Sequence, residues 1–128
     1  MLLVKNKLAP SSIHGLGLFA EEYIPSGSVI WKWIDGFDGK VSIESVESLP
    51  LVCRKYFEIY GWIENGKYNF CIDNQKYINH SDNPNCIVSD DGSVGIAGRD
   101  IEAGEEITED YRSFDENFGK RDFGFDWT

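Results

Sequence analysis

The densest group of chemically useful side chains lies between Tyr77 and Cys86, in the segment YINHSDNPNC. Asn and His side chains both donate and accept hydrogen bonds, so such a run suits binding a polar ligand or holding loop backbone from inside. A solvated turn is the alternative, because Asn83-Pro84 favours turns. Composition alone favours the turn, so a functional interpretation needs support from elsewhere in the chain.

Two further segments carry residue types that could take part in chemistry. In residues 13–20 (IHGLGLFA), Gly15 and Gly17 would let a ligand lie against bare backbone. In residues 103–111 (AGEEITEDY), Ile107 alternates with acidic neighbours, which predicts a short strand with Tyr111 at its end. Each signal is weak alone, since a glycine turn explains the first and a core tyrosine bonded to a carbonyl explains the second.

Taken together and in this order, the three segments resemble the SET domain of protein lysine methyltransferases. Residues 15–20 (GLGLFA) are similar to the family's N-terminal G-x-G segment. Residues 78–81 (INHS) with Pro84-Asn85 resemble its N-H-S-C-x-P-N signature. Residues 97–111 (AGRDIEAGEEITEDY) resemble its R-D-I…G-E-E-(L/I)-T-x-D-Y end. The resemblance spans residues 13 to 111, and the last two motifs combined are highly specific.

The resemblance implies a mainly β fold, the β-clip, in which small curled sheets hold a C-terminal pseudoknot beside one substantial helix. We expect a single SET domain over residues 1–128, with residues 112–128 as a tail. The implied activity transfers a methyl group from S-adenosylmethionine to a lysine of a basic protein such as a histone, with Tyr111 as the catalytic tyrosine. The residues expected to contact the cofactor are His14, Gly15, Leu16, Gly17, Phe70, Asn79, His80 and Trp127.

The sequence departs from the family pattern in two places. Asp82 stands where the family commonly has cysteine, and no cysteine follows Tyr111 in these 128 residues. The zinc-binding cysteine cluster that closes the active site in many relatives is therefore not expected, and no metal is predicted. We expect the aromatic tail to form an apolar lid instead, from Phe114, Phe118, Phe123, Phe125 and Trp127.

Methyl transfer to lysine needs a neutral amine, although free lysine has a pKa of about 10.4. Presenting the neutral amine at pH 7 costs roughly 4–5 kcal/mol. An apolar aromatic channel beside a sulfonium cation lowers that pKa through desolvation and like-charge repulsion. We therefore expect no acidic catalytic residue, because a carboxylate beside the amine would retain the proton. Tyr111 would orient the amine.

Composition limits the partners and the compartment. The formal net charge is −10, from 22 acidic and 12 basic residues, and no basic cluster is visible, which disfavours direct nucleic-acid binding. An acidic surface would instead attract a cationic protein, unless the charge serves only solubility. Three cysteines without paired spacing favour a reducing compartment. No secretory signal or membrane span is recognisable, so we expect an intracellular protein, cytoplasmic or nuclear and chromosomal.

The elements that must position these residues are mostly strands. Runs of β-type residues predict strands over 2–8, 18–20, 28–33, 62–64, 67–72, 86–89 and 93–97. Asn65-Gly66 predicts a tight hairpin, and Asp90-Asp91-Gly92 a second one.

One substantial helix is predicted after Ser48, which would cap it, with Pro50 in its first turn and Gly61 as a left-handed stop. Its expected buried face consists of Cys53, Tyr56, Phe57 and Tyr60. A weaker helical segment is predicted over residues 42–47, and residues 114–127 have no assignment.

Several alternatives stay open. The fold could serve as a non-catalytic module that binds a basic segment, or the enzyme could act on a non-lysine or small-molecule amine. A homodimer through exposed aromatic side chains is also open. Residues 15–20 fit a G-x-G-x-x-A dinucleotide pattern, but residues 5–12 are not an apolar strand. Zinc binding by Cys71, His80 and Cys86 matches no usual ligand spacing.

Overall fold

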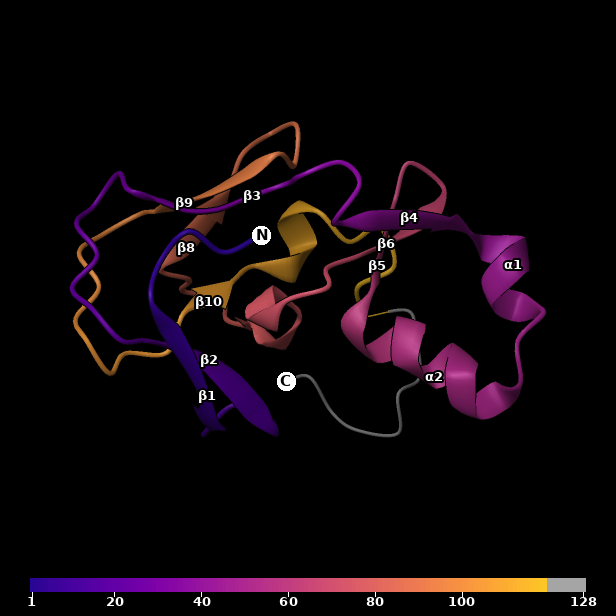
Figure 1. Ribbon diagram of the computed structural model, residues 1–128, viewed down its shortest axis with the longest axis horizontal. Coiled ribbons are helices and arrows are strands. Elements are labelled where there is room, and N and C mark those ends of the chain that lie inside the picture. The colour runs from indigo at the N-terminus through magenta and orange to yellow at the C-terminus, as the bar shows by residue number, and fades with distance from the viewer. Residues whose placement is uncertain (120–128) are drawn as a thin grey trace.

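The computed structural model describes residues 1–119, which form two lobes (Figure 1). The first lobe holds most strands: β1 (Asn6–Pro10), β2 (Leu16–Ala20), β3 (Val29–Lys32), β7 (Asn79–His80), β8 (Cys86–Val88), β9 (Val94–Ala97) and β10 (Thr108–Glu109). The second lobe contains β4 (Gly39–Ser42), α1 (Ile43–Glu47), α2 (Leu51–Tyr60), β5 (Trp62–Glu64) and β6 (Lys67–Phe70). The 3-10 helices are η1 (Asn74–Tyr77) and η2 (Tyr111–Ser113).

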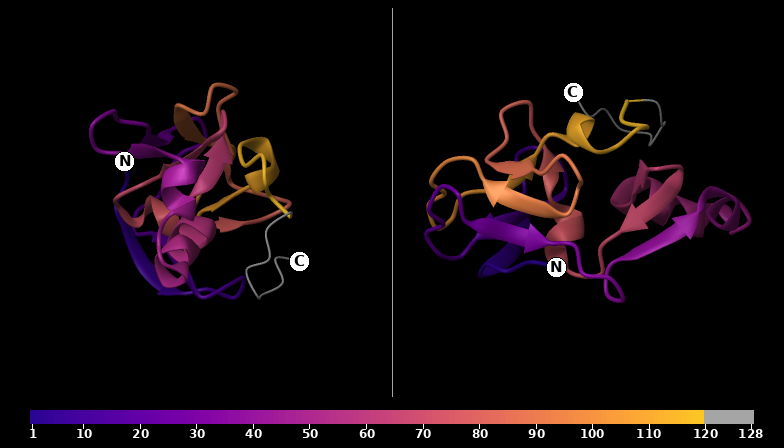
Figure 2. Two further views of the ribbon diagram at one scale, coloured as in Figure 1. Left: turned by 90° about the vertical axis from the view of Figure 1, so that its right-hand side faces the viewer. Right: turned by 90° about the horizontal axis from the view of Figure 1, so that it is seen from above.

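The strands form four small sheets rather than one large one. The sheet orders are β1-β2, β10-β7, β3-β9-β8 and β4-β6-β5. Figure 2 shows the lobe with β4, β5, β6 and both helices standing apart from the rest of the molecule. The predicted mainly β class, with small curled sheets and one substantial helix, is confirmed.

Each lobe has its own apolar core. The first is built from ten buried residues: Leu18, Ala20, Ile24, Ile30, Trp31, Ile78, Cys86, Ala97, Ile101 and Ile107. The second is smaller and consists of Val46, Ile63 and Tyr68, with Phe57 of α2 packed against it. The second lobe is therefore a thin layer of helix on sheet, and the space between the two cores is available for a site.

Both predicted hairpins are present. Asn65 and Gly66 have φ angles of 54° and 71°, as a tight turn between β5 and β6 requires. Gly92 has a φ of 74° in the turn between β8 and β9, where the Asp91 carboxylate accepts the Ser93 backbone N–H at 3.0 Å. Both turns follow directly from residue types that tolerate positive φ.

The first strand lies further along the chain than predicted. Pairing of β1 with β2 runs from Asn6 to Pro10, whereas Leu2 makes only an isolated bridge to Trp31. The reason is that the Leu3 N–H bonds to Ile30 and thus draws the first residues across to β3. Because β1 and β2 form an antiparallel hairpin around Gly15, the dinucleotide interpretation of this glycine pair is excluded.

The ends of the two helices correct three details of the prediction. Ser48 ends α1 instead of capping α2, because its N–H bonds to the Glu44 carbonyl at 3.0 Å. Gly61 ends α2 in an extended conformation with a φ of −90°, not in the left-handed one. A Cβ at Gly61 would lie 2.7 Å from the Phe57 carbonyl, so glycine is needed there for close approach. Only Phe57 and Tyr60 of the expected face are half-buried, while Cys53 and Tyr56 are exposed.

The shorter helix is as predicted. The Ser42 hydroxyl accepts the Ser45 N–H at 3.1 Å and so caps α1, which covers residues 43–47. Neither helix within residues 1–119 is long and apolar enough to cross a membrane.

The C-terminal segment is held between two parts of the 79–88 region. Strand β10 pairs in parallel with β7 and also contacts β8. Asn85 is 1% exposed, its amide donates to the Glu106 carbonyl at 2.8 Å, and it accepts the Thr108 N–H at 2.9 Å. The segment thus passes through a loop that is bonded to it on both sides, which is the pseudoknot that the sequence resemblance implies.

We predict that Asn85→Ala destabilises the fold strongly. The change leaves the Glu106 carbonyl and the Thr108 N–H without their buried partner, which should lower the free energy of unfolding by about 2–4 kcal/mol. Urea unfolding followed by tryptophan fluorescence measures the loss. The matched control is Asn83→Ala in the same loop, where the side chain is exposed and a change within about 0.5 kcal/mol is expected. Equal effects of the two variants would contradict this role of Asn85.

Candidate active site

The parallel pairing of β7 and β10 brings the Asn-His segment next to the segment that ends at Tyr111. Thr108 lies opposite Asn79, and Glu109 lies opposite His80. The Ser81 N–H continues the ladder by bonding to the Glu109 carbonyl at 2.9 Å. Tyr111 therefore emerges directly beside the Asn79-His80 pair.

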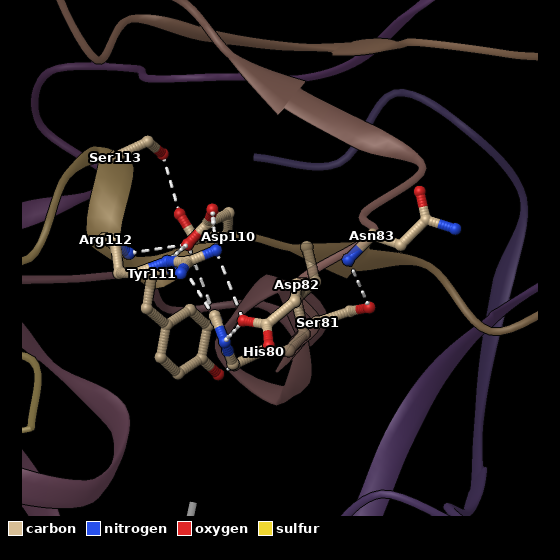
Figure 3. A network of polar contacts seen from close by, with 9 residues as sticks. His80, Ser81, Asp82, Asn83, Asp110, Tyr111, Arg112 and Ser113 are labelled. Atoms are coloured by element: carbon tan, nitrogen blue, oxygen red, sulfur yellow. Dashed lines mark hydrogen bonds and ion pairs between the residues drawn. The ribbon is translucent and has the colours of Figure 1, made fainter. Parts of the chain in front are cut away.

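His80 holds the backbone of Tyr111 in place (Figure 3). Its Nδ1 accepts the Tyr111 N–H at 3.1 Å, so the ring hydrogen lies on Nε2, which donates to Asp82 at 2.9 Å. The imidazole is 8% exposed. Asp82, which occupies the position where the family commonly has cysteine, thus orients the histidine that positions Tyr111.

An ion pair secures the same turn from the solvent side. Arg112 donates to both carboxylate oxygens of Asp110, each at 2.8 Å, and Figure 3 shows these contacts next to His80. Hydrogen bonding from Arg112 lowers the pKa of Asp110 below its usual value. Asp110 also caps η2, since its carboxylate accepts the Arg112 backbone N–H at 3.0 Å.

The Tyr111 side chain is enclosed by aromatic rings and by backbone. Its hydroxyl donates to the Ile78 carbonyl. Its ring centroid lies 5.4 Å from that of His80, 5.7 Å from that of Phe114 and 5.8 Å from that of Phe118. Phe118 also lies 4.7 Å from the His80 ring. The first two aromatic residues of the expected lid thus pack against the candidate catalytic tyrosine.

Two cavities meet at Tyr111. The first, here called the loop cavity, has about 530 Å³ of empty space, part of it open to solvent, and is lined by His14, Gly15, Leu16, Ile59, Tyr60, Lys76, Tyr77, Asn79 and Tyr111. The second, here called the aromatic cavity, has about 700 Å³ and shares Ile59, Tyr60, Lys76 and Tyr111 with the first. Its further lining includes Trp31, Trp62, Cys71, Gln75, Ile78, Glu109, Phe114 and Phe118.

The loop cavity depends on Asn79 for its shape. Its side-chain amide donates to the carbonyls of His14 at 3.0 Å and Leu16 at 3.2 Å, and contacts a Glu106 carboxylate oxygen at 3.1 Å. The Ser11 hydroxyl bonds to the same carboxylate at 2.7 Å. Asn79 and Glu106 therefore hold the 11–16 loop from inside, which is the loop-holding role that Asn-rich segments suit.

Glu109 is an unexpected feature of the aromatic cavity. The residue is 4% exposed, and Trp31 Nε1 donates to its carboxyl group at 3.2 Å. Desolvation by burial raises the pKa of Glu109 to about 8, while the bond from Trp31 works in the opposite direction. Trp31 has room there because a Cβ at Gly95 would lie only 2.1 Å from its Nε1. The channel without a carboxylate that the chemistry led us to expect thus contains a buried carboxyl group.

Two more polar atoms on the wall of the aromatic cavity have no hydrogen-bond partner among residues 1–119. They are Gln75 Oε1 and Trp62 Nε1, both shielded from solvent. Gln75 as a whole is 7% exposed. Buried polar atoms are normally satisfied, so these two are candidates for bonding to a ligand.

The predicted cofactor residues separate into three groups. His14, Gly15, Leu16 and Asn79 line the loop cavity together, whereas Gly17 and His80 are buried and do not line it. Gly17 gives room to Glu106, because a Cβ there would lie 2.6 Å from the carboxylate.

Phe70 is not among the residues that line either cavity and packs against Phe57 with ring centroids 5.7 Å apart. Its assignment to the cofactor stays a prediction without support from this geometry. Trp127, with Phe123 and Phe125, lies outside the described residues.

Sequence reasoning missed Lys76, Trp31 and Glu109. Lys76 precedes the recognised motif by two residues and lines both cavities. For Glu109 a signal existed, since the period-two alternation of a strand places it on the side of Ile107 and Tyr111. Trp31 had no local signal, because only the pairing of β3 with β9 brings it to the site. Within residues 1–119 no three His, Cys, Asp or Glu side chains gather as a metal site.

Known proteins with similar sequences agree on one domain. The SET domain family model matches residues 15–112. A Plasmodium falciparum relative, whose name assigns it provisionally as histone-lysine N-methyltransferase 1, is 37% identical over 87% of this chain. A histone-lysine N-methyltransferase of Aspergillus oryzae, named as H3 lysine-4 specific, is 33% identical over 83% of the chain. Human histone-lysine N-methyltransferase 2D is 30% identical over 82% of it. The chain spans 2%, 9% and 2% of the lengths of these relatives.

Solved structures agree on the fold. A humanized mutant of the Chaetomium thermophilum Polycomb Repressive Complex 2 superposes with a TM-score of 0.64 at 22% identity, over 91% of this chain and 16% of that one. A Plasmodium falciparum histone methyltransferase structure, also provisionally named, gives a TM-score of 0.61 at 23% identity, over 86% and 95% of the two chains. Because the family model covers the three motifs, Tyr111 and the pseudoknot segment, the chain belongs to the SET-domain family.

Proposed function

We propose that this chain is an S-adenosylmethionine-dependent lysine methyltransferase that acts on a basic protein such as a histone. The observation that carries the proposal is the meeting of the two cavities at Tyr111. One compartment would hold the methyl donor and the other the acceptor side chain, so that the reacting atoms approach in line. The names of its relatives, which are histone-lysine methyltransferases, support the same activity.

The residues of the loop cavity fit the proposed cofactor. S-adenosylmethionine, when bound, supplies a methyl group on a sulfonium cation. The Lys76 ammonium would pair with the cofactor carboxylate, and the rings of Tyr60 and Tyr77 offer aromatic faces to its adenine. Gly15, with a φ of 45° and nothing within 4 Å of its Cβ position, leaves the loop backbone open to a ligand. Asn79 would keep that backbone in register.

The aromatic cavity fits a lysine side chain. Tyr60, Trp62, Phe114 and Phe118 would enclose the aliphatic stem and keep water from the amine. Tyr111 would orient the amine at the boundary between the cavities, with its own backbone fixed by His80. A net charge of −10 would raise the local concentration of a basic substrate.

The decisive test is transfer of radiolabel from S-adenosylmethionine to a panel of basic proteins that includes histones. We expect label on lysine, and we expect Tyr111→Phe to lower kcat by about 100-fold or more, because the amine loses its orienting hydroxyl. Tyr23→Phe is the matched control, since Tyr23 is 50% exposed and lies away from both cavities, and it should retain wild-type activity.

Two outcomes would contradict the proposal. Cofactor binding by calorimetry without any transfer would favour a non-catalytic module that recognises a basic segment. If the folded protein shows no cofactor binding and no transfer, the cofactor assignment is wrong as well.

A further inference from the structure

Glu109 is a buried carboxyl group that the proposed role of Tyr111, orienting the amine, does not require. It lies on the wall of the aromatic cavity, two residues before Tyr111, with its carboxyl group bonded to Trp31 at 3.2 Å. Replacing a buried charge-bearing group by an apolar one of similar shape is often neutral or stabilising, so stability alone does not account for a carboxyl group here.

We propose that the Glu109 carboxylate removes a proton from the acceptor ammonium before methyl transfer. The inference rests on the proposed lysine methyltransferase activity and adds a catalytic base to it. It makes Glu109 a residue that touches the acceptor amine from the side of the aromatic cavity.

Of the two unpartnered buried atoms of the cavity, the acceptor Gln75 Oε1 suits a ligand with N–H groups, whereas Trp62 Nε1 is itself a donor. Gln75 Oε1 is a buried acceptor that no group among residues 1–119 satisfies. With the Glu109 carboxylate it provides acceptor groups from two residues that line the cavity, which suits an alkylammonium with three donors. An anionic or purely apolar ligand would leave Gln75 Oε1 without a donor.

No cation among residues 1–119 forms an ion pair with Glu109. Burial raises the pKa values of the Cys71 and Cys86 thiols, and the charge of Glu109 adds to the effect on both. The other titratable residues that line the same cavity are Glu58, Tyr60, Glu64, Lys76, Tyr111 and Asp115. Of these, Lys76 is the cation, and its Nζ lies 3.3 Å from the Tyr56 hydroxyl.

The proposed step balances as a proton transfer followed by a displacement. An N–H bond of the ammonium breaks and an O–H bond forms on Glu109, which yields a neutral amine and a neutral carboxylic acid. The freed nitrogen lone pair then forms the N–C bond while the S–C bond of the sulfonium donor breaks and its electron pair stays on sulfur. The product is a methylammonium, and Glu109 returns its proton to water before the next turnover.

Burial also gives Glu109 a suitable proton affinity. Its pKa of about 8 lies near a working pH of 7–8, where a general base is most effective. An ordinary glutamate, with a pKa near 4.3, would be too weak a base for an alkylammonium.

The test compares the pH dependence of kcat for wild type and Glu109→Gln. The amide keeps an oxygen for the Trp31 N–H but cannot take a proton. We expect the wild-type rate to rise with pH up to an inflection near pH 8, and the variant to lack this inflection and to be slower by about 100-fold at pH 7.5. Its affinity for S-adenosylmethionine, measured by calorimetry, should equal that of the wild type. Glu47→Gln, which removes an exposed charge on α1, should leave rate and profile unchanged.

Trp31→Phe provides a second and independent variant. Loss of the Nε1 donor destabilises the Glu109 carboxylate, so the inflection should move to higher pH by about one unit. A merely structural role of Trp31 would lower the rate at every pH without this shift.

The results separate the two proposals. A Glu109→Gln enzyme with wild-type kcat and an unchanged profile overturns the role of Glu109 and leaves the methyltransferase proposal standing. A wild-type protein that transfers no label at any pH overturns both.

A stability measurement checks the burial of Glu109 without any substrate. Its folded-state pKa is raised, so unfolding between about pH 4.5 and pH 8 releases the proton that the folded state retains. The unfolding equilibrium constant of the wild type should therefore rise, relative to Glu109→Gln, by up to about tenfold per pH unit over this range. Urea unfolding at pH 5, 6.5 and 8 measures the ratio, and a constant ratio would show that Glu109 is ionised in the folded state.

Discussion

The buried amide of Asn85 is the interaction on which the site depends. A parallel pair of two residues, β7 with β10, is too short to hold a chain segment by itself. Asn85 adds bonds to the Glu106 carbonyl and the Thr108 N–H, so the segment is held on both sides before it reaches Tyr111. The apolar core secures the same place, because Ile107 is fully buried between these two contacts. The positions of Glu106, Glu109 and Tyr111 all follow from this one arrangement.

Acidic residues in that segment have different surroundings, and their chemistry differs accordingly. Glu106 is bonded to Ser11 and Asn79 and organises the loop cavity. Asp110, next to Arg112, has a lowered pKa and stays ionised as a cap. Glu109, directly before it, has a raised pKa because it is buried, and the hydrogen bond from the Trp31 indole offsets only part of this effect. The pKa values of these two adjacent carboxyl groups are shifted in opposite directions, which suits Asp110 to a structural ion pair and Glu109 to proton transfer.

Local sequence signals were sufficient for the turns, the shorter helix and the motifs of the site. Asn65-Gly66 and Ser42 act through their own backbone preferences, so short windows of sequence reveal them. Gly61 was predicted as a helix end for the wrong reason, because the close approach of Phe57 and Asn69 carbonyls depends on tertiary packing. The contact of Trp31 with Glu109 joins residues 78 positions apart and could not be read from either neighbourhood. A contact between residues so far apart in the sequence can be predicted only once the strand topology is known.

The presence of Glu109 changes how the cavity would supply a neutral amine. A free lysine and an ordinary glutamate differ by about 6 pKa units, so proton transfer from the ammonium to the carboxylate would cost about 8 kcal/mol. With the pKa of Glu109 at about 8, the difference falls to about 2.4 units and the cost to about 3 kcal/mol. A nearby sulfonium lowers the amine's pKa further, since it repels the ammonium and not the neutral amine. A carboxylate with a low pKa leaves the proton on a neighbouring amine. Burial raises the pKa of Glu109, so this carboxylate can take the proton. Desolvation therefore acts on both partners at once, because it makes the ammonium a stronger acid and the carboxylate a stronger base.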